Sequence, residues 1–174
     1  MLIAMAGLPG AGKSTLAARL AAELGAVVLC KDVVRAALFP PPALDYSVEQ
    51  DDVSMAAVCS AAASILRAHP RQTVILDGRT FSRAYQVRDL LAAAAAIGET
   101  PRLIECTCAD EVARMRIEND QARGVHPAAN RTFALYLERK AAAEPIIASR
   151  LVLDTGLTDL EECVRRCLAW LQLG

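Results

Sequence analysis

The sequence predicts an α/β domain built on a parallel β-sheet with helices on both faces. Short apolar runs alternate with longer segments of helical periodicity, which is the order of a β-α-β-α chain. The runs are almost wholly apolar instead of alternating with polar residues, as expected for strands buried on both faces. No linker rich in Pro, Ser or Gly divides the 174 residues, so we expect a single domain.

Each predicted element follows from its own pattern and its own boundary signal. The predicted strands are the apolar runs at residues 2–6, 27–30, 73–76, 102–107 and 151–153. The predicted helices cover residues 12–24, 48–68, 82–97, 110–123 and 158–171, and the first four end at or just before a Gly or Pro. Thr158 is the predicted N-cap of the last helix, with Glu161 completing a capping box.

Two segments are predicted to interrupt the helices. Residues 36–45 contain three consecutive prolines and should form a loop. Residues 124–130, with His126 and Pro127, should separate two helices.

Composition excludes several classes of protein. The formal net charge is -1, so the field of the whole molecule does not attract polyanions. The longest strictly apolar stretch, which ends at Ile97, is far shorter than the ~20 residues that cross a bilayer, and no basic segment precedes the first apolar run. We therefore expect a soluble, cytoplasmic protein whose six cysteines are free thiols.

One motif carries chemistry by itself. The segment Gly7 to Ser14, GLPGAGKS, fits the P-loop pattern G-x-x-x-x-G-K-[ST] and stands between a predicted strand and a predicted helix. Its backbone N–H groups and the helix N-terminus are expected to hold the phosphates of ATP, with Lys13 adding charge and Ser14 binding Mg²⁺. The predicted phosphate-binding residues are Leu8, Pro9, Gly10, Ala11, Gly12, Lys13, Ser14 and Thr15.

Two acidic positions are candidates for the remaining chemistry. Asp77 ends an apolar strand, as the Walker-B acid does, and is the candidate for orienting Mg²⁺; its alternative role is a helix cap or a turn with Gly78. Asp32 and Arg35 follow the second strand three residues apart, so in a helix they share one face. Such a pair suits activation of an acceptor hydroxyl, and its alternative is a cap with a surface salt bridge.

Together these motifs resemble the small P-loop kinases grouped around the 5'-hydroxyl polynucleotide kinases, with zeta-toxin-like and chloramphenicol-phosphotransferase-like enzymes as relatives. The resemblance rests on the P-loop, on D-x-x-R at Asp32 and Arg35, and on the strand that ends in Asp77-Gly78 with an arginine at 83. It implies a five-stranded parallel sheet of order 2-3-1-4-5 with a helical lid at about residues 109–145. It also implies that Asp32 is the general base and that Arg35 contacts substrate phosphate.

The same resemblance implies that Arg116 is an arginine that closes over ATP. Family members often have a second arginine three residues later, where this chain has Asn119, so Arg123 and Arg131 are alternatives. Arg79 is an unusual residue beside a phosphate site, and we expect it to contact an anionic group of the acceptor. This departure weakens the case for a plain nucleic-acid end as substrate.

The predicted function is an ATP- and Mg²⁺-dependent kinase that phosphorylates a hydroxyl group, with catalytic residues Lys13, Asp32, Arg35 and Arg116. The acidic chain favours a small-molecule acceptor slightly over nucleic acid. The alternative is a regulatory or ATP-hydrolysing module without an acceptor. The sequence contains no N-K-x-D tetrad, which argues against a GTPase.

Overall fold

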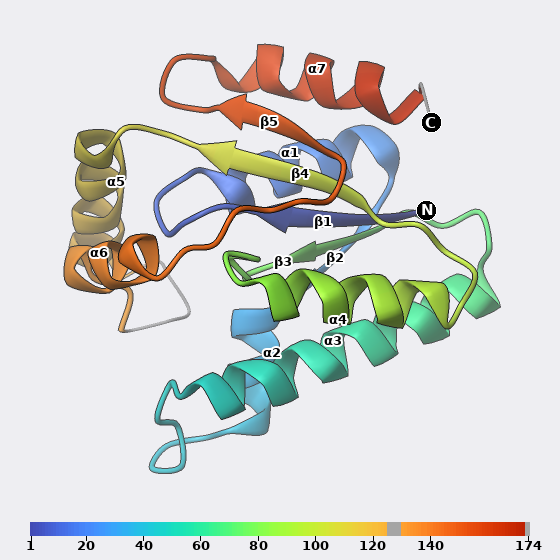
Figure 1. The fold of residues 1–174 in the computed structure, drawn as a ribbon, viewed down its shortest axis with the longest axis horizontal. Coiled ribbons are helices and arrows are strands. Elements are labelled where there is room, and N and C mark those ends of the chain that lie inside the picture. The colour runs from blue at the N-terminus through green and yellow to red at the C-terminus, as the bar shows by residue number, and fades with distance from the viewer. Residues whose placement is uncertain (125–129, 173–174) are drawn as a thin grey trace.

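The computed structural model describes residues 1–124 and 130–172, in which strands and helices alternate (Figure 1). In chain order the elements are β1 (Leu2–Ala6), α1 (Lys13–Leu24), β2 (Val27–Cys30), α2 (Lys31–Leu38), α3 (Val48–Ala68), β3 (Val74–Asp77), α4 (Ala84–Ala95), β4 (Arg102–Thr107), α5 (Asp110–Arg123), α6 (Phe133–Ala141), β5 (Arg150–Asp154) and α7 (Leu160–Gln172).

The strands form one five-stranded sheet of order β2-β3-β1-β4-β5, and every neighbouring pair is parallel. The predicted α/β class and the strand order implied by the resemblance are both confirmed. β1 lies in the centre, where Ile3 faces Ile75 of β3 on one side and Arg102 of β4 on the other. The chain order reverses beside β1, and ligands of open α/β sheets bind at such a point, beyond the carboxyl ends of the strands.

Alternate residues of β1 pack into different layers. Leu2, Ala4 and Ala6 join the apolar cluster between the sheet and helices α3 and α4. Ile3 and Met5 join the cluster between the sheet and helices α1 and α7. In Figure 1, α7 lies above the sheet, α1 lies partly hidden behind β4, and α3 and α4 lie below the sheet. Because both faces are covered, all five residues of β1 are buried, which explains their continuous apolar character.

The edge strands depart from this expectation. Val27 and Val28 of β2 are each 37% exposed, and Val152 of β5 is 44% exposed. An edge strand has a neighbouring strand on one side only, which leaves its residues more exposed. An apolar run therefore predicts the strand correctly here without predicting its burial.

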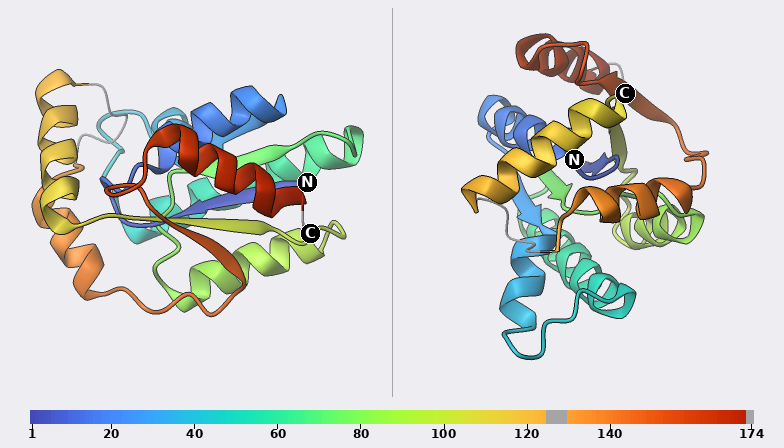
Figure 2. Two further views of the ribbon diagram at one scale, coloured as in Figure 1. Left: turned by 90° about the horizontal axis from the view of Figure 1, so that it is seen from above. Right: turned by 90° about the vertical axis from the view of Figure 1, so that its left-hand side faces the viewer.

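Two helices stand at the carboxyl end of the sheet. Figure 2 shows α5 and α6 together there, apart from the two layers that cover the sheet. Their contact buries Ala113, Ile117 and Tyr136, and the Tyr136 hydroxyl donates to Asp110 Oδ1 at 2.7 Å. The segment expected to separate them falls mostly on residues 125–129. These residues, which include His126, lie outside the described residues.

Some predicted boundaries are wrong. The region expected to be a loop from residue 36 begins later, because α2 continues to Leu38 and only then meets the prolines. The last helix begins at Leu160 instead of residue 158, and its N-cap is Asp159, whose Oδ1 accepts from the Glu162 N–H at 2.8 Å. Thr158 therefore lies before the cap. A carboxylate one residue later satisfies the free N–H groups of the first turn instead.

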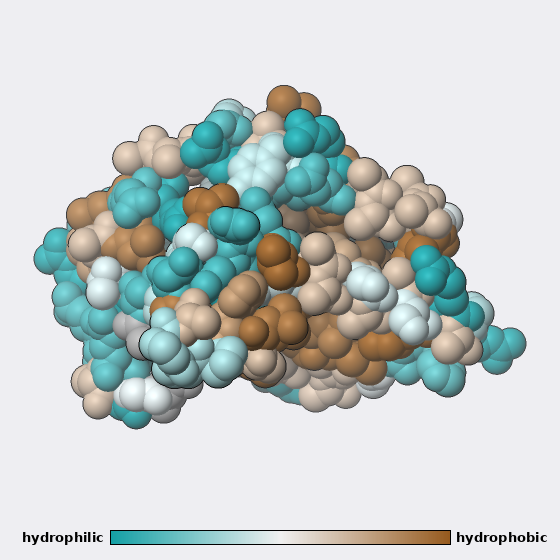
Figure 3. All heavy atoms as spheres, turned by 90° about the horizontal axis from the view of Figure 1, so that it is seen from below, coloured by the Kyte–Doolittle hydropathy of each residue, from teal (hydrophilic) through white to brown (hydrophobic). Residues whose placement is uncertain are grey.

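Hydrophobic side chains also gather on the outer side of the helices below the sheet (Figure 3). A cavity of about 410 Å³ opens there between α3 and α4, with Met55, Cys59, Leu90 and Ile97 among its walls. Across the described part of the chain, every helix is too short or too polar to span a bilayer.

Candidate functional site

The P-loop forms the turn between β1 and α1, and its shape depends on glycine. Gly7, Gly10 and Gly12 all have positive φ angles, of 125°, 80° and 82°. A Cβ on Gly7 would lie 2.1 Å from the Cys106 carbonyl oxygen, and one on Gly10 would lie 2.8 Å from that of Ala113. Only glycine fits these positions, because a side chain would collide with the backbone of β4 or α5.

Lys13 turns back over this loop. Its Nζ donates to the carbonyl oxygens of Gly7 at 2.7 Å and Leu8 at 2.9 Å. Desolvation lowers the pKa of Lys13, and the nearby carboxylate of Asp77 partly opposes that effect. A phosphate group in the loop would offer this ammonium an anionic partner in place of two neutral carbonyl groups.

Asp77 has the properties that a magnesium site requires. It is 4% exposed, and its Oδ1 has no hydrogen-bond partner among the described residues. It does not cap α4, whose N-cap is Arg83. A buried carboxylate oxygen without a donor is costly, and Mg²⁺ or a water bound to it would satisfy that oxygen. The residues present, Asp77 and the exposed Ser14 hydroxyl at the start of α1, therefore fit the ion.

A second charged cluster lies at the start of α2. Arg35 Nη2 donates to Asp32 Oδ1 at 2.9 Å, so the two side chains share a face as the spacing predicted. Both residues are buried, and the N-cap of α2 is Cys30, so this is neither a surface salt bridge nor a helix cap. The buried Lys31 adds a further cation, with its Nζ 3.2 Å from the same Asp32 oxygen.

Asp51, in the first turn of α3, completes this cluster. Its Oδ1 accepts from Lys31 Nζ at 2.6 Å and from Arg35 Nη1 at 2.5 Å. Two carboxylates and two cations are thus joined into one network, and the guanidinium of Arg35 also lies 4.6 Å from the ring centroid of Tyr46. Sequence reasoning missed Lys31, Tyr46 and Asp51. The scarcity of lysine and an acidic residue in the first turn of a helix were the available signals.

The candidate arginines of α5 and its neighbourhood occupy different places. Arg116 Nη1 donates to the Gly10 carbonyl at 3.2 Å and to Thr155 Oγ1 at 2.9 Å, which joins α5 to the P-loop and to the end of β5. Arg131 pairs with Asp120, and its charge acts on Lys13. Arg123 is exposed and does not line the cavity. Of the two alternatives to Arg116, only Arg131 faces the P-loop.

The expectation for Arg79 is not met. Arg79 is 6% exposed and lines the cavity between α3 and α4 instead of the one at the P-loop. Its Nη1 donates to the Asp51 carbonyl at 3.3 Å, and its Nη2 pairs with the carboxylate of Asp52. The charge that seemed available for an acceptor is used to fix the first turn of α3.

A single cavity of about 530 Å³ connects the P-loop to the network at α2. Six of the eight predicted phosphate-binding residues line it, whereas Leu8 and Ala11 line a smaller cavity behind the loop. Asp32, Arg35 and Arg116 also line it, and Asp77 does not. The described residues on its wall are Pro9, Gly10, Gly12, Lys13, Ser14, Thr15, Leu16, Lys31, Asp32, Arg35, Tyr46, Asp51, Gly78, Thr80, Arg116, Asp120, Asn130, Arg131, Leu135, Arg139, Thr155, Thr158, Asp159, Leu160 and Cys163.

Comparison with known proteins gives a family and a set of similar folds. A family model described as an AAA domain matches residues 2–145. No sequence among the curated proteins matches the chain.

Three solved structures have similar folds. A candidate kinase from Chloroflexus aurantiacus has a TM-score of 0.77 at 23% identity, covering 97% of this chain and 96% of that one. A gluconokinase from Sinorhizobium meliloti 1021 has a TM-score of 0.71 at 18% identity, covering 98% and 91%. The Mycobacterium tuberculosis APS kinase CysC, in complex with AMPPNP and APS, has a TM-score of 0.70 at 16% identity, covering 98% of each chain. These similarities show the fold, and none of the three structures is named as a polynucleotide kinase.

Proposed function

The chain belongs to the AAA domain family, and we propose that it is an ATP- and Mg²⁺-dependent kinase that phosphorylates a hydroxyl group of a small molecule. One observation carries the proposal: a single cavity is lined both by the P-loop and by the buried network of Lys31, Asp32, Arg35 and Asp51. A phosphoryl donor and an acceptor can therefore meet in it. Phosphoryl transfer depends mainly on such positioning and on electrostatic stabilisation.

The P-loop end is assigned to ATP. The N–H groups of the loop and the side chains of Lys13, Ser14 and Thr15 would hold the phosphates. Ser14 and Asp77 would hold Mg²⁺, which when bound neutralises charge on the β- and γ-phosphates. The APS kinase of similar fold, which is in complex with AMPPNP, supports a nucleotide in this position.

The α2 end is assigned to the acceptor. Its hydroxyl oxygen attacks the γ-phosphorus, the bond from that phosphorus to the β–γ bridging oxygen breaks, and the hydroxyl proton passes to Asp32. Arg35 and Lys31 both bind Oδ1 of Asp32, and no described residue is a partner of its Oδ2. That second oxygen is therefore available as the base, while the two cations fix the orientation of the carboxylate.

A small-molecule acceptor fits the charge and the enclosure of the site. The formal net charge of -1 gives no broad attraction for a polynucleotide. The gluconokinase and the APS kinase of similar fold are named for small molecules. We assign the helical pair of about residues 109–145 as the lid within one kinase domain, with Arg116 contacting ATP and Arg131 as the second candidate.

The test measures ADP release by the purified protein with Mg²⁺ and ATP, with and without a panel of hydroxyl compounds. We expect one class of acceptor to raise ADP release and to become phosphorylated. Asp32→Asn should lower transfer by about 10²-fold or more, because the proton acceptor is removed, and should leave ATP binding at the P-loop unchanged. Asp89→Asn, in an exposed ion pair outside the site, is the matched control. ADP release that no acceptor changes would instead support a regulatory or hydrolysing module.

A further inference from the structure

Nearly all basic side chains of the cavity that connects the P-loop to the network at α2 already have hydrogen-bond or ion-pair partners. Within the described chain, six basic side chains line it: Lys13, Lys31, Arg35, Arg116, Arg131 and Arg139. Lys13 and Arg116 donate to backbone carbonyl groups, and Arg131 pairs with Asp120. Arg139 is different, since none of the described residues is its partner in a hydrogen bond or an ion pair.

The network at α2 cannot supply positive charge to an anionic acceptor. Lys31 and Arg35 are each bound to both Asp32 and Asp51, so two cations and two carboxylates balance. All contacts lie among side chains that are at most 22% exposed. Drawing either cation away would leave two largely buried carboxylates with only one cation between them, which is costly. Any cation that binds an anion on the acceptor must come from elsewhere on the wall.

Arg139 is on the face of α6 that lines the cavity. Leu135 and Arg139, four residues apart, both line it, as does Arg131 four residues before Leu135. The adjoining face of the helix is fixed, because the Tyr136 hydroxyl and Lys140 Nζ both bind Asp110. The helix therefore cannot roll Arg139 out of the cavity without breaking these bonds.

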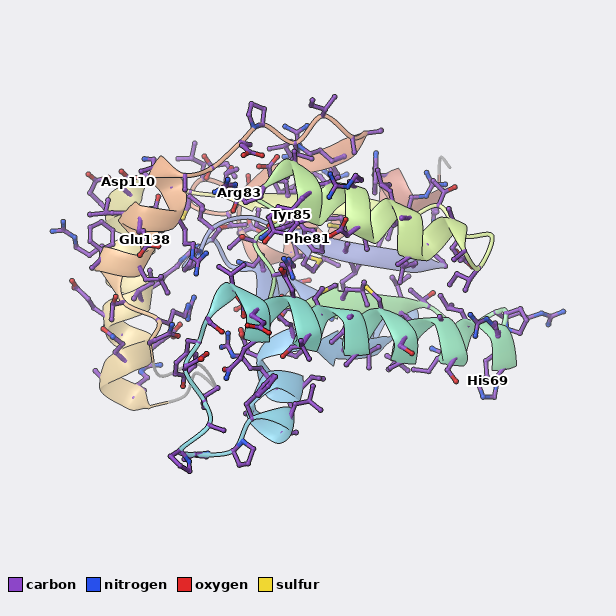
Figure 4. The ribbon with its side chains drawn as sticks, turned by 60° about the horizontal axis from the view of Figure 1, so that its bottom comes forward. His69, Phe81, Arg83, Tyr85, Asp110 and Glu138 are labelled. Atoms are coloured by element: carbon purple, nitrogen blue, oxygen red, sulfur yellow. The ribbon has the colours of Figure 1, made fainter. Side chains whose placement is uncertain are left out.

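The carboxyl end of α6 lies beside the loop that follows β3. Just beyond the helix, the Glu144 N–H donates to the Ser82 carbonyl at 2.8 Å, and the Glu144 carboxylate accepts from the Ala84 N–H at 2.6 Å. These bonds hold the end of α6 beside the loop after β3, which carries the cavity residue Thr80. In Figure 4, Glu138 on α6 and Arg83 at the start of α4 lie toward one end of the molecule, with His69 at the opposite end. Arg131, before the amino end of α6, is instead the residue whose charge reaches Lys13.

From this arrangement we propose that Arg139 binds an anionic group of the acceptor, so that the second substrate is a small molecule with both a hydroxyl and a carboxylate, phosphate or sulfate group. The inference rests on the proposed kinase function and adds the chemical class of its acceptor. Asp32 would take the hydroxyl while the guanidinium of Arg139 takes the anion in a bidentate pair. Two contacts at separate points fix the orientation of a small acceptor in the cavity.

The test uses sulfate as the probe and the full chain with AMPPNP bound in the nucleotide half of the cavity. AMPPNP with Mg²⁺ is first titrated by calorimetry, then sulfate is titrated into the loaded protein at constant ionic strength. We expect saturable sulfate binding by the wild type, about tenfold or more weaker binding by Arg139→Gln, and an unchanged melting temperature, since no partner is lost. Arg71→Gln, an exposed arginine before β3, is the matched control and should bind sulfate as the wild type does. Parallel titrations with acetate and inorganic phosphate rank the three kinds of anion.

The outcomes separate this inference from the kinase proposal. The role of Arg139 is overturned if the AMPPNP-loaded wild type shows no saturable sulfate binding, or if Arg139→Gln binds sulfate as well as the wild type does. Either result leaves the kinase proposal standing. Protein that does not bind AMPPNP overturns both. An equal loss of sulfate binding in Arg71→Gln would also overturn it, because the effect would then reflect net charge alone.

Discussion

Asp51→Asn tests the buried network most directly, because one oxygen of Asp51 binds two cations. Asp51 Oδ1 accepts from Lys31 Nζ at 2.6 Å and from Arg35 Nη1 at 2.5 Å. A hydrogen bond to a charged group contributes ~1.5–3 kcal/mol, and breaking a buried ion pair costs ~3–5 kcal/mol. The Asp51 side chain is 22% exposed and asparagine keeps one acceptor oxygen, so the lower end applies. We expect the free energy of unfolding to fall by about 2–3 kcal/mol.

Urea denaturation and thermal melting measure this loss. For a chain of this size a change of 1 kcal/mol shifts Tm by ~2–4 °C, so the expected decrease is about 4–12 °C at an unchanged urea m-value. Asp89→Asn removes a carboxylate from an exposed pair with Arg88 and should cost less than ~0.5 kcal/mol. A loss for Asp51→Asn no larger than that of the control would refute the reasoning, because Lys31 and Arg35 would then not depend on Asp51.

Two further substitutions test the nucleotide half of the site. Lys13→Ala should weaken ATP binding about tenfold or more, or abolish transfer, because the ammonium over the P-loop is lost; calorimetry with Mg²⁺ and ATP measures it, and unchanged binding and transfer would remove the argument from the P-loop. Arg116→Ala should lower kcat by about tenfold or more with a smaller change in ATP affinity, because this cation is assigned to the charge of the transition state. Steady-state kinetics measure the difference, and a normal kcat would transfer the role to Arg131.

The fold could be predicted from local patterns because each strand of this sheet is a short apolar run with a clear boundary. Three of the five strands have the predicted bounds, as β1 shows with residues 2–6. The strand order could not be derived from such runs, since order depends on which pairs of strands meet in space, and it came from the resemblance. The wrong start of α7 has a local cause: Thr158 and Asp159 are both good N-caps, and their spacing to the following residues does not decide between them.

Less of the candidate site could be predicted, because much of it depends on contacts between distant segments. The P-loop was predictable as a contiguous motif, and Asp32 and Arg35 were predictable as two residues on one helical turn. Asp51 reaches this pair from 16 residues beyond Arg35, after a loop whose path the sequence does not define. Arg79 was misinterpreted for the same reason, since its partner Asp52 belongs to α3, 27 residues earlier.

Asp51 and Asp52 also indicate how differently the two halves of the cavity respond to ligands. Neighbouring carboxylates at the start of α3 bind Arg35 on one side and Arg79 on the other, so the acceptor half is held by charged pairs before any ligand arrives. In the nucleotide half, Lys13 and Arg116 donate to the neutral carbonyls of Gly7 and Gly10. Exchanging these carbonyls for phosphate oxygens replaces neutral hydrogen bonds with charge-assisted ones, which are roughly twice as strong. ATP binding should therefore reorganise the P-loop and α5 and gain electrostatic energy there, while the acceptor half contributes geometry that already exists.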